Sequence, residues 1–349
     1  MAYDYCLQGF DAVPGSAYAI LFTVNHPYFF MKIIDSLAKA IALADTGSVA
    51  TIGNFDGVHQ GHQQLIGNMV DKAREEGLPS VVVTFSPHPE RFFSPSTAPP
   101  LIMPESVKFQ AIAELGVDYI LVLPFTQALA SLSPADFVQS VLCKGLSVRH
   151  LFVGHDYAFG KGRQGNAALL TELGQTAGFS LTQLPPVYLQ GDIVSSTRIR
   201  GLVQEGRMGL VASLLGRPFF LEGVVGHGKN RGGKSLGFPT ANLACIEGLL
   251  LPKEGVYAVR VMLKDQVAPL PLKPTGTALS GMTNVGVNPT FGDVPLGIET
   301  HLLDFQQDIY HTGMRVWFMA RMRDENAFSS LDALIQQLGR DAQNARSLL

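Results

Sequence analysis

The pattern of apolar residues changes near Gly216, and this change limits the folds that the chain can adopt. From Ser48 to that point, strand-like runs alternate with helix-like segments, which is typical of a parallel sheet covered by helices on both faces. From Pro218 to Met322 the runs are short and strand-like, with Gly and Pro clusters between them, as in a small β-barrel or sandwich. We therefore expect a lead-in at residues 1–47 and an α/β domain with a doubly wound parallel sheet at residues 48–215. A small β-barrel domain with a terminal helix is expected at residues 216–349.

Apolar periodicity and capping residues predict the individual elements. Gly77 ends a helix whose apolar residues recur every three or four positions, and Ser133 followed by Pro134 is a helix start. In the first domain we expect strands at Ser48–Gly53, Ser80–Phe85, Asp118–Leu123 and Leu151–Gly154. We expect helices there at His62–Glu76, Glu105–Leu115 and Ser133–Cys143. In the second we expect strands at Phe219–Val225, Val256–Leu263, Met282–Val287, Ile298–Leu303 and Val316–Met322, and a helix at Ser330–Ala345 with Leu331, Leu334, Ile335 and Leu338 on one face.

The composition argues against several classes of protein. The chain has 349 residues, 46% of them apolar, and a formal net charge of −3, so we expect packed cores and no broad basic surface for nucleic acid. Its three cysteines, Cys6, Cys143 and Cys245, lie far apart and form no CxxC pair. This spacing argues against a zinc site or a disulfide framework and fits a reducing cytoplasm.

The apolar stretch from Tyr18 to Met31 is not expected to cross a membrane or to direct secretion. Asn25, His26 and Pro27 interrupt it, a membrane helix needs about 20 apolar residues, and no basic segment precedes it. Met31 begins an amphipathic stretch, so a natural start at Met31 and a real N-terminal extension remain alternatives. We expect a cytoplasmic protein with no membrane partner.

A ten-residue motif, GNFDGVHQGH at Gly53–His62, follows a predicted strand and leads into a predicted helix. The free N–H groups and positive dipole of a helix start favour phosphate, and the three glycines let the backbone approach a ligand closely. His59 and His62 are three residues apart, so both can lie on one side of the first turn and stabilise charge that builds on a phosphate. The alternative is that the two histidines only cap the helix.

A second helix start, SSTRIR at Ser195–Arg200, combines hydroxyl groups with two arginines. Hydroxyl and guanidinium groups together can bind a phosphate. Taken alone, the segment is better interpreted as an ordinary N-cap with solvated arginines. Together with the first motif, it predicts the other side of a triphosphate site.

A glycine-rich basic stretch, Gly226–Lys234, precedes the string GFPTAN at Gly237–Asn242. Its backbone N–H groups can fold over phosphates. The letters GKNRGGKS match the spacing of a P-loop, but the glycine and proline of GFPTAN prevent the long helix that a P-loop requires. Thr240 and Asn242 offer hard oxygen ligands that can share Mg²⁺ with ATP. Glu299 lies in a strand-like run, where a lone glutamate is usually a solvated surface residue.

The strings together resemble the prokaryotic bifunctional riboflavin kinase/FAD synthetase family, over about residues 48–346. HxGH with a downstream SSTxxR is similar to the signature of nucleotidylyltransferases. The longer strings that carry the resemblance are Gly53–His62, Val83–Pro89, Phe152–Gly160, Gly165-Asn166, Gly237–Asn242, Asn284–Phe291, Glu299–Leu303 and Arg321–Glu325. An aminoacyl-tRNA synthetase shares a HIGH-type signature, but this chain has no KMSKS-like partner and no basic surface for tRNA.

The resemblance implies two ATP-dependent reactions, with ATP as co-substrate and Mg²⁺ as metal cofactor. Riboflavin is phosphorylated to FMN, and FMN is adenylylated to FAD with release of pyrophosphate, without a protein nucleophile. In the first domain it implies ATP phosphate contacts at His59, His62, Gly53, Asn54, Phe55, Asp56, Gly61, Ser196, Thr197 and Arg198, and flavin contacts at Phe85, Pro87, Asp156 and Asn166. In the second it implies Glu299 as the base for the ribityl 5′-hydroxyl, Thr240 and Asn242 as metal ligands, Gly228 and Gly237 at the ATP phosphates, and Arg323 near the flavin.

Two features depart from the family pattern. The loop Lys229–Lys234 is about one residue longer than usual and has Lys234 where arginine is commoner, which keeps the charge but loses the bidentate fork. The proline-rich loop after Asp265 is also long.

We expect riboflavin, FMN, FAD and ATP as partners of a monomer or weak homo-oligomer. The alternatives are a protein with one active half and one flavin-binding half, and a non-catalytic flavin-binding protein; the presence of both predicted sites argues against each.

Overall fold

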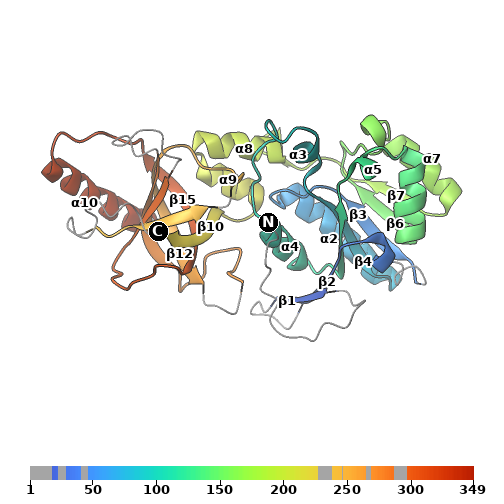
Figure 1. The fold of residues 1–349 in the computed structure, drawn as a ribbon, viewed down its shortest axis with the longest axis horizontal. Coiled ribbons are helices and arrows are strands. Elements are labelled where there is room, and N and C mark those ends of the chain that lie inside the picture. Colours follow the sequence, from blue (N-terminus) through green and yellow to red (C-terminus); the bar gives the residue numbers. More distant parts are fainter. Residues whose placement is uncertain are drawn as a thin grey trace.

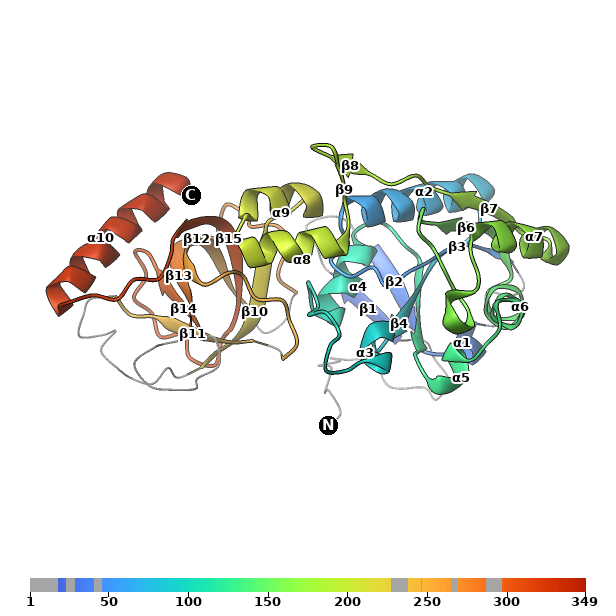
Figure 2. The same ribbon diagram turned by 90° about the horizontal axis from the view of Figure 1, so that it is seen from above.

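The computed structural model describes residues 18–22, 29–40, 46–226, 238–245, 247–264, 269–286 and 297–349. An α/β domain and a β-barrel lie side by side along the long axis, with helices α8 (Ser196–Glu205) and α9 (Met208–Leu215) between them (Figures 1 and 2). Within these ranges every helix is too short or too polar to span a bilayer.

The first domain is built on a sheet with the strand order β1-β2-β5-β4-β3-β6-β7, in which only β1 runs antiparallel to its neighbour. The strands of this domain are β1 (Tyr18–Phe22), β2 (Phe29–Ile34), β3 (Ser48–Ile52), β4 (Ser80–Ser86), β5 (Tyr119–Pro124), β6 (Val148–Val153), β7 (Ser180–Gln183) and a small separate pair, β8 (Tyr188–Leu189) and β9 (Asp192–Ile193). Besides α8 and α9, its helices are α1 (Leu37–Ala40), α2 (Gln60–Glu76), α3 (Pro89–Phe93), α4 (Glu105–Ala113), α5 (Gln127–Ala130), α6 (Pro134–Phe137), the π-helix η2 (Val138–Gly145), the 3-10 helix η3 (Lys161–Arg163) and α7 (Ala167–Ala177).

Helices cover both faces of this sheet because side chains of a strand alternate between its two faces. Val49 and Val82 face a core that includes residues of α2 and α4, whereas Ala50 and Val81 face a second core formed with η2 and α7. The predicted doubly wound parallel sheet is therefore confirmed.

Several elements of this domain were not expected from the sequence, among them α7, β7 and the strands before Ser48. No strand was expected before Ser48, yet β2 pairs in parallel with β5, with Lys32 opposite Tyr119. The isolated apolar run at Phe29–Ile34 has no adjacent pattern of turns or helices to mark it as part of a sheet. The helix expected at Ser133–Cys143 starts where predicted, because the Ser133 hydroxyl caps Asp136, but it continues as a π-helix.

Six strands of the second domain close into an antiparallel barrel, in the order β10-β11-β14-β13-β12-β15. They are β10 (Phe219–Gly226), β11 (Ala241–Cys245), β12 (Gly255–Lys264), β13 (Leu279–Gly286), β14 (Gly297–Leu302) and β15 (Gly313–Arg323). Helix α10 (Leu331–Leu348) follows, capped by Ser330. The predicted barrel and terminal helix are confirmed, and β11 is an additional strand.

The contact face of α10 differs in part from the expected apolar stripe. Leu331 is exposed, whereas Asp341, Ala342 and Ala345 are buried. The buried carboxylate of Asp341 accepts three hydrogen bonds from the guanidinium of Arg323 on β15, the shortest of them 2.6 Å. A polar pair, in addition to apolar packing, therefore holds this helix on the barrel.

Arg217, at the start of the barrel domain, joins the two domains. It is only 6% exposed, and its guanidinium donates hydrogen bonds to the carbonyl oxygens of Gly57 (2.5 Å), Val58 (3.2 Å) and Leu215 (3.2 Å). The Gln63 amide on α2 donates to the carbonyls of Val58 and Leu215 as well, at 2.8 Å each. The loop that contains the HxGH motif is therefore held from the barrel side.

Two further contacts connect the domains. Leu101 and Leu249 form a parallel β-bridge, in which the Leu101 N–H donates to the Gly248 carbonyl (2.9 Å) and the Leu250 N–H to the Leu101 carbonyl (2.8 Å). The proline-rich loop after Asp265, described from residue 269 onward, contributes too, because the Gln110 amide on α4 donates to the Leu270 carbonyl at 3.0 Å. This loop packs against the first domain.

We expect Arg217→Met to destabilise the protein by about 2–4 kcal/mol, because it leaves buried carbonyl groups without donors. The measurement is urea-induced unfolding followed by tryptophan fluorescence, since the single tryptophan, Trp317, is fully buried in a core cluster that contains residues of both domains. The control is Arg207→Met, an exposed arginine, which should change the stability by less than about 0.5 kcal/mol. Equal losses in the two variants would contradict the assigned role.

Candidate functional site

The Gly53–His62 loop joins the carboxyl end of β3 to the start of α2. Its backbone is unusual, because Phe55 and Val58 have positive φ angles of 52° and 38°. A β-carbon on Gly53 would lie 2.9 Å from the Phe55 ring, so glycine is needed there for close packing. The loop is therefore a tightly packed turn that directs the first N–H groups of α2 to the edge of the sheet.

The two histidines of the motif stack on each other. Their ring centroids are 3.6 Å apart with an interplanar angle of 16°, and the His62 ring also meets the edge of Phe55 at 5.2 Å. The His59 Nδ1 accepts a hydrogen bond from the His62 N–H (3.3 Å), so His59 does cap α2. The Nδ1 of His62 is buried and has no hydrogen-bond partner among the described residues. The capping alternative is therefore correct for His59 but does not account for His62.

Burial keeps both imidazoles neutral. It lowers the pKa of His59 to about 4. The charge of the nearby Arg217 guanidinium lowers this pKa too, but by less than burial does. The pKa of His62 also lies well below its usual value, because of burial and then the proximity of His59 and Lys108. Neutral imidazoles at pH 7 act on a phosphate as hydrogen-bond donors without carrying a full charge.

A cavity of about 780 Å³ opens in front of this loop. Its walls come from segments that follow β3, β4, β5, β6 and β7, and from the start of α8. The carboxyl ends of these parallel strands meet at one edge, and β3 lies where the chain order reverses, between β4 and β6. Ligands of open α/β sheets bind at such a position.

The structure brings most of the residues predicted for the first site to this cavity. Its lining includes Gly53, Asn54, Phe55, Asp56, His59, Gly61, His62, Phe85, Asp156, Ser196 and Thr197. Pro87 and Asn166 are not among the lining residues. Pro87 follows the cis Ser86–Pro87 bond, and the Asn166 side chain caps α7 by accepting from the Leu169 N–H at 3.0 Å.

Of the two arginines of SSTRIR, Arg200 lines the cavity and Arg198 does not. Arg198 instead pairs with Asp192 at 3.2 Å and donates to the carbonyl of Leu189, both on the small β8–β9 hairpin. Sequence reasoning selected Arg198, but the signal for Arg200 was available. In a helix, residues four apart share a face, whereas residues two apart do not, so Ser196 and Arg200 point the same way.

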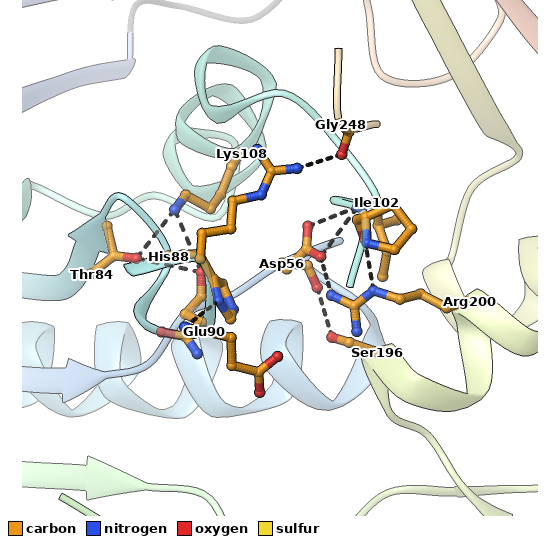
Figure 3. Close-up of polar contacts among 12 residues, drawn as sticks. Asp56, Thr84, His88, Glu90, Ile102, Lys108, Ser196, Arg200 and Gly248 are labelled. Atoms are coloured by element: carbon orange, nitrogen blue, oxygen red, sulfur yellow. Dashed lines mark hydrogen bonds and ion pairs between the residues drawn. The ribbon is translucent and has the colours of Figure 1, made fainter. Parts of the chain in front are cut away.

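Figure 3 shows polar contacts of residues that line this cavity and of the nearby Thr84 and Lys108, which do not line it. The Asp56 carboxylate lies 2.6 Å from the Arg200 guanidinium, and the Ser196 hydroxyl donates to the Asp56 carbonyl at 2.9 Å. Lys108 on α4 donates to the Thr84 hydroxyl at 3.2 Å, and its burial lowers its pKa. Lys108 was not singled out from the sequence, where it is one charged residue of an apolar helix.

The second predicted site lies on three adjacent barrel strands. Asn242 on β11 and Asn284 on β13 are the register partners of Glu299 on β14, one on either side. The Asn284 amide donates to Glu325 at 2.7 Å. Burial, and then the charge of Glu325, raises the pKa of Glu299. Two of the predicted residues, Asn242 and Glu299, therefore face each other across one pair of strands.

The GFPTAN string is tied to the strand that carries Glu299. The His301 Nδ1 lies 2.8 Å from the carbonyl oxygen of Pro239, and its ring meets the edge of Phe238 at 5.1 Å. Thr240 is exposed, and Asn242 follows it on β11, so a hydroxyl and an amide oxygen are available to a hard cation. The described residues contain no cluster of three His, Cys, Asp or Glu side chains that would form a metal site by themselves.

Some predicted residues of the second site have other positions. Gly228 and Gly237, most of the glycine-rich loop and residues 287–291 lie outside the described residues. Arg323 is held by Asp341 of α10, as described above, and its guanidinium also lies 5.9 Å from the Phe328 ring centroid. These contacts involve only residues of the protein, so the flavin contact of Arg323 stays a prediction.

Comparisons with known proteins match both domains. A family model described as FAD synthetase matches residues 42–198, and one described as riboflavin kinase matches residues 215–349. A bifunctional riboflavin kinase/FMN adenylyltransferase of Pseudomonas fluorescens is 42% identical over 303 residues, which cover 86% of this chain and 93% of the relative. An Escherichia coli (strain K12) protein of the same description is 37% identical over 316 residues, covering 90% and 97%.

A solved structure also matches most of the chain. It is described as a macrolide-efflux protein from Streptococcus pneumoniae, with a TM-score of 0.75 and 30% sequence identity, and it covers 86% of this chain and 94% of its own. The combination of the two domains in one chain is therefore shared with a known structure.

The neutral state of His59 makes stability depend on pH. Since the pKa is about 6.5 in an unfolded chain and about 4 in the fold, stability is lost as the pH falls from 6.5 toward 4. We expect the wild type to lose roughly 2 kcal/mol more than His59→Gln between pH 7 and pH 4.5, measured by urea unfolding at each pH. Parallel losses in the two proteins would show that His59 is not buried in the neutral form.

Proposed function

This chain belongs to the bifunctional riboflavin kinase/FMN adenylyltransferase family, and we propose that each of its two domains uses ATP at the site described above. The barrel domain phosphorylates riboflavin to FMN, and the α/β domain transfers AMP from ATP to FMN, forming FAD and pyrophosphate. The observation that carries this proposal is that matches to both family models accompany two separate groups of site residues, one in each domain. Riboflavin, FMN, FAD and ATP are thus the proposed ligands.

In the α/β domain we assign the chemistry to positioning and charge stabilisation. The FMN phosphate oxygen attacks the α-phosphorus of ATP, the bond from that phosphorus to the bridging oxygen breaks, and pyrophosphate leaves. His59 and His62 donate to phosphate oxygens together with the first N–H groups of α2. Ser196 and Thr197 act from the start of α8, where Arg200 is better placed than Arg198 to provide a guanidinium. Phe85 and Asp156 line the part of the cavity that we assign to the flavin.

In the barrel domain we assign Glu299 as the general base. It takes the proton from the ribityl 5′-hydroxyl as that oxygen attacks the γ-phosphorus, and ADP leaves. A pKa raised by burial and by Glu325 makes the carboxylate a better proton acceptor. Thr240 and Asn242 would hold Mg²⁺, which supplies charge neutralisation on the phosphates. Gly228 and Gly237 remain predicted phosphate contacts, and Arg323 a predicted flavin contact.

The experiment that tests the bifunctional proposal is incubation of the full chain with riboflavin, ATP and Mg²⁺, followed by chromatographic separation of the flavins. We expect FMN to appear first and FAD after it. EDTA in excess of Mg²⁺ should stop FMN formation. If FAD does not form even when FMN is supplied, the α/β domain lacks the proposed activity.

Two single substitutions should separate the reactions. Glu299→Gln removes the base, so we expect riboflavin phosphorylation to fall by about 10²–10⁴-fold while FMN is still converted to FAD. His62→Ala removes a phosphate donor, so we expect adenylyl transfer to fall by about 10²–10³-fold with the kinase rate unchanged. Each variant serves as the control for the other, and a folded variant that lost both activities would disprove the assignment to separate sites.

A further inference from the structure

Asp56 lies in the HxGH loop and lines the cavity, but its carboxylate already has partners. Both carboxylate oxygens accept the Ile102 N–H at 3.1 Å, and Oδ2 lies 2.6 Å from the Arg200 Nη2. The Asp56 side chain is only 6% exposed, and that of Arg200 13%. An anionic group with these neighbours is a poor ligand for another anion, so a direct contact with ATP phosphates is electrostatically unfavourable.

The opposite side of Arg200 is held as well. Its Nε donates to the Pro100 carbonyl at 2.8 Å, and Pro100 lies two residues before Ile102, whose N–H donates to Asp56 (Figure 3). Asp56 and Pro100 thus hold two of the three guanidinium nitrogens. The third, Nη1, has no protein partner among the described residues and remains for a ligand in the cavity.

The two contacts of Asp56 with α8 are chemically separate. Its backbone carbonyl accepts from the Ser196 hydroxyl, and its side chain accepts from Arg200, one helical turn further on. Changing the side chain therefore leaves the first contact in place. This separation allows the effect on the arginine to be measured by itself.

We propose that Asp56 is a positioning residue for adenylyl transfer, whose carboxylate holds the Arg200 guanidinium at the cavity so that Nη1 meets a phosphate oxygen of ATP. This inference rests on the proposed adenylyltransferase function and adds a role for a residue that contacts no reacting atom. A guanidinium held in advance needs no reorganisation when charge develops in the transition state. Loss of the carboxylate should therefore lower kcat more than it raises the KM for ATP.

The test is a double-mutant cycle in the full chain, with FMN-to-FAD conversion as the readout. Asp56→Asn keeps an oxygen that can accept from Ile102 but removes the charge next to Arg200. We expect it to lower kcat by about 10–100-fold, since a displacement of about 1 Å at a catalytic group has effects of this size, and to change the KM for ATP by less than threefold. In an Arg200→Gln background the same substitution should change kcat by less than twofold.

Two controls separate positioning from general damage. Asp341→Asn removes the charge of another buried Asp–Arg pair, which also has a 2.6 Å contact, but in the barrel; it should leave adenylyl transfer within twofold of the wild type. The kinase rate reports on folding for the Asp56 and Arg200 variants. For Asp341→Asn, which releases Arg323 in the kinase domain, the circular dichroism spectrum reports on folding instead. If Asp56→Asn does not fold, Asp56→Glu is used in both backgrounds, because it keeps the charge and moves it by one methylene group.

The outcomes are distinct. The positioning role would be overturned if Asp56→Asn lowered kcat by the same factor in the wild type and in the Arg200→Gln background. A loss of the same size in Asp341→Asn would overturn it as well. A rise in the KM for ATP with kcat unchanged would also overturn it, since that result indicates ground-state binding by Asp56 itself. Failure of the wild type to convert FMN to FAD would instead contradict the proposed function.

Discussion

The hydrogen bonds of Arg217 are the interaction on which the arrangement of this molecule depends. The guanidinium comes from the first residues of the barrel domain and donates to carbonyl groups of the HxGH loop and of α9. Its Nη1 and Nη2 are paired, whereas the buried Nε has no partner among the described residues. Two of the acceptors, Gly57 and Val58, belong to a turn with three residues at positive φ. This irregular turn of the sheet domain is thus held by its neighbour.

Two helix starts complete the first site. The starts of α2 and α8 both line the cavity, so their free N–H groups and dipoles meet at one place. The Asp56 carbonyl and carboxylate fix the second helix relative to the loop before the first. The barrel site is built differently, from side chains on adjacent antiparallel strands, where register alone places Asn242 beside Glu299. One site therefore depends on side-chain contacts between loops and helix starts, and the other on the register of paired strands.

Patterns with a clear period could be predicted from the sequence, and contacts between distant segments could not. The parallel sheet, the closed barrel and the starts of α8 and α10 followed from apolar periodicity and capping residues. Strand β2 was missed because nothing near it marks its partner β5, and β11 because its first two residues, Ala241 and Asn242, belong to a motif that was interpreted chemically. The contact of Asp56 with Arg200, 144 positions further along the chain, could not be predicted for the same reason. Arg200 itself was recoverable from helical spacing.

The β-bridge between Leu101 and Leu249 has a consequence for ligand binding. On one side of it, Ile102 donates to Asp56; on the other, Leu249 follows strand β11 in the sequence, and β11 begins one residue after Thr240. The bridge therefore joins two segments that carry residues of the two sites. Whatever free energy a ligand at one site transmits through this connection, a ligand at the other must transmit equally in return. An effect of ATP or flavin in the barrel on binding in the sheet domain would thus have a reverse effect of the same size.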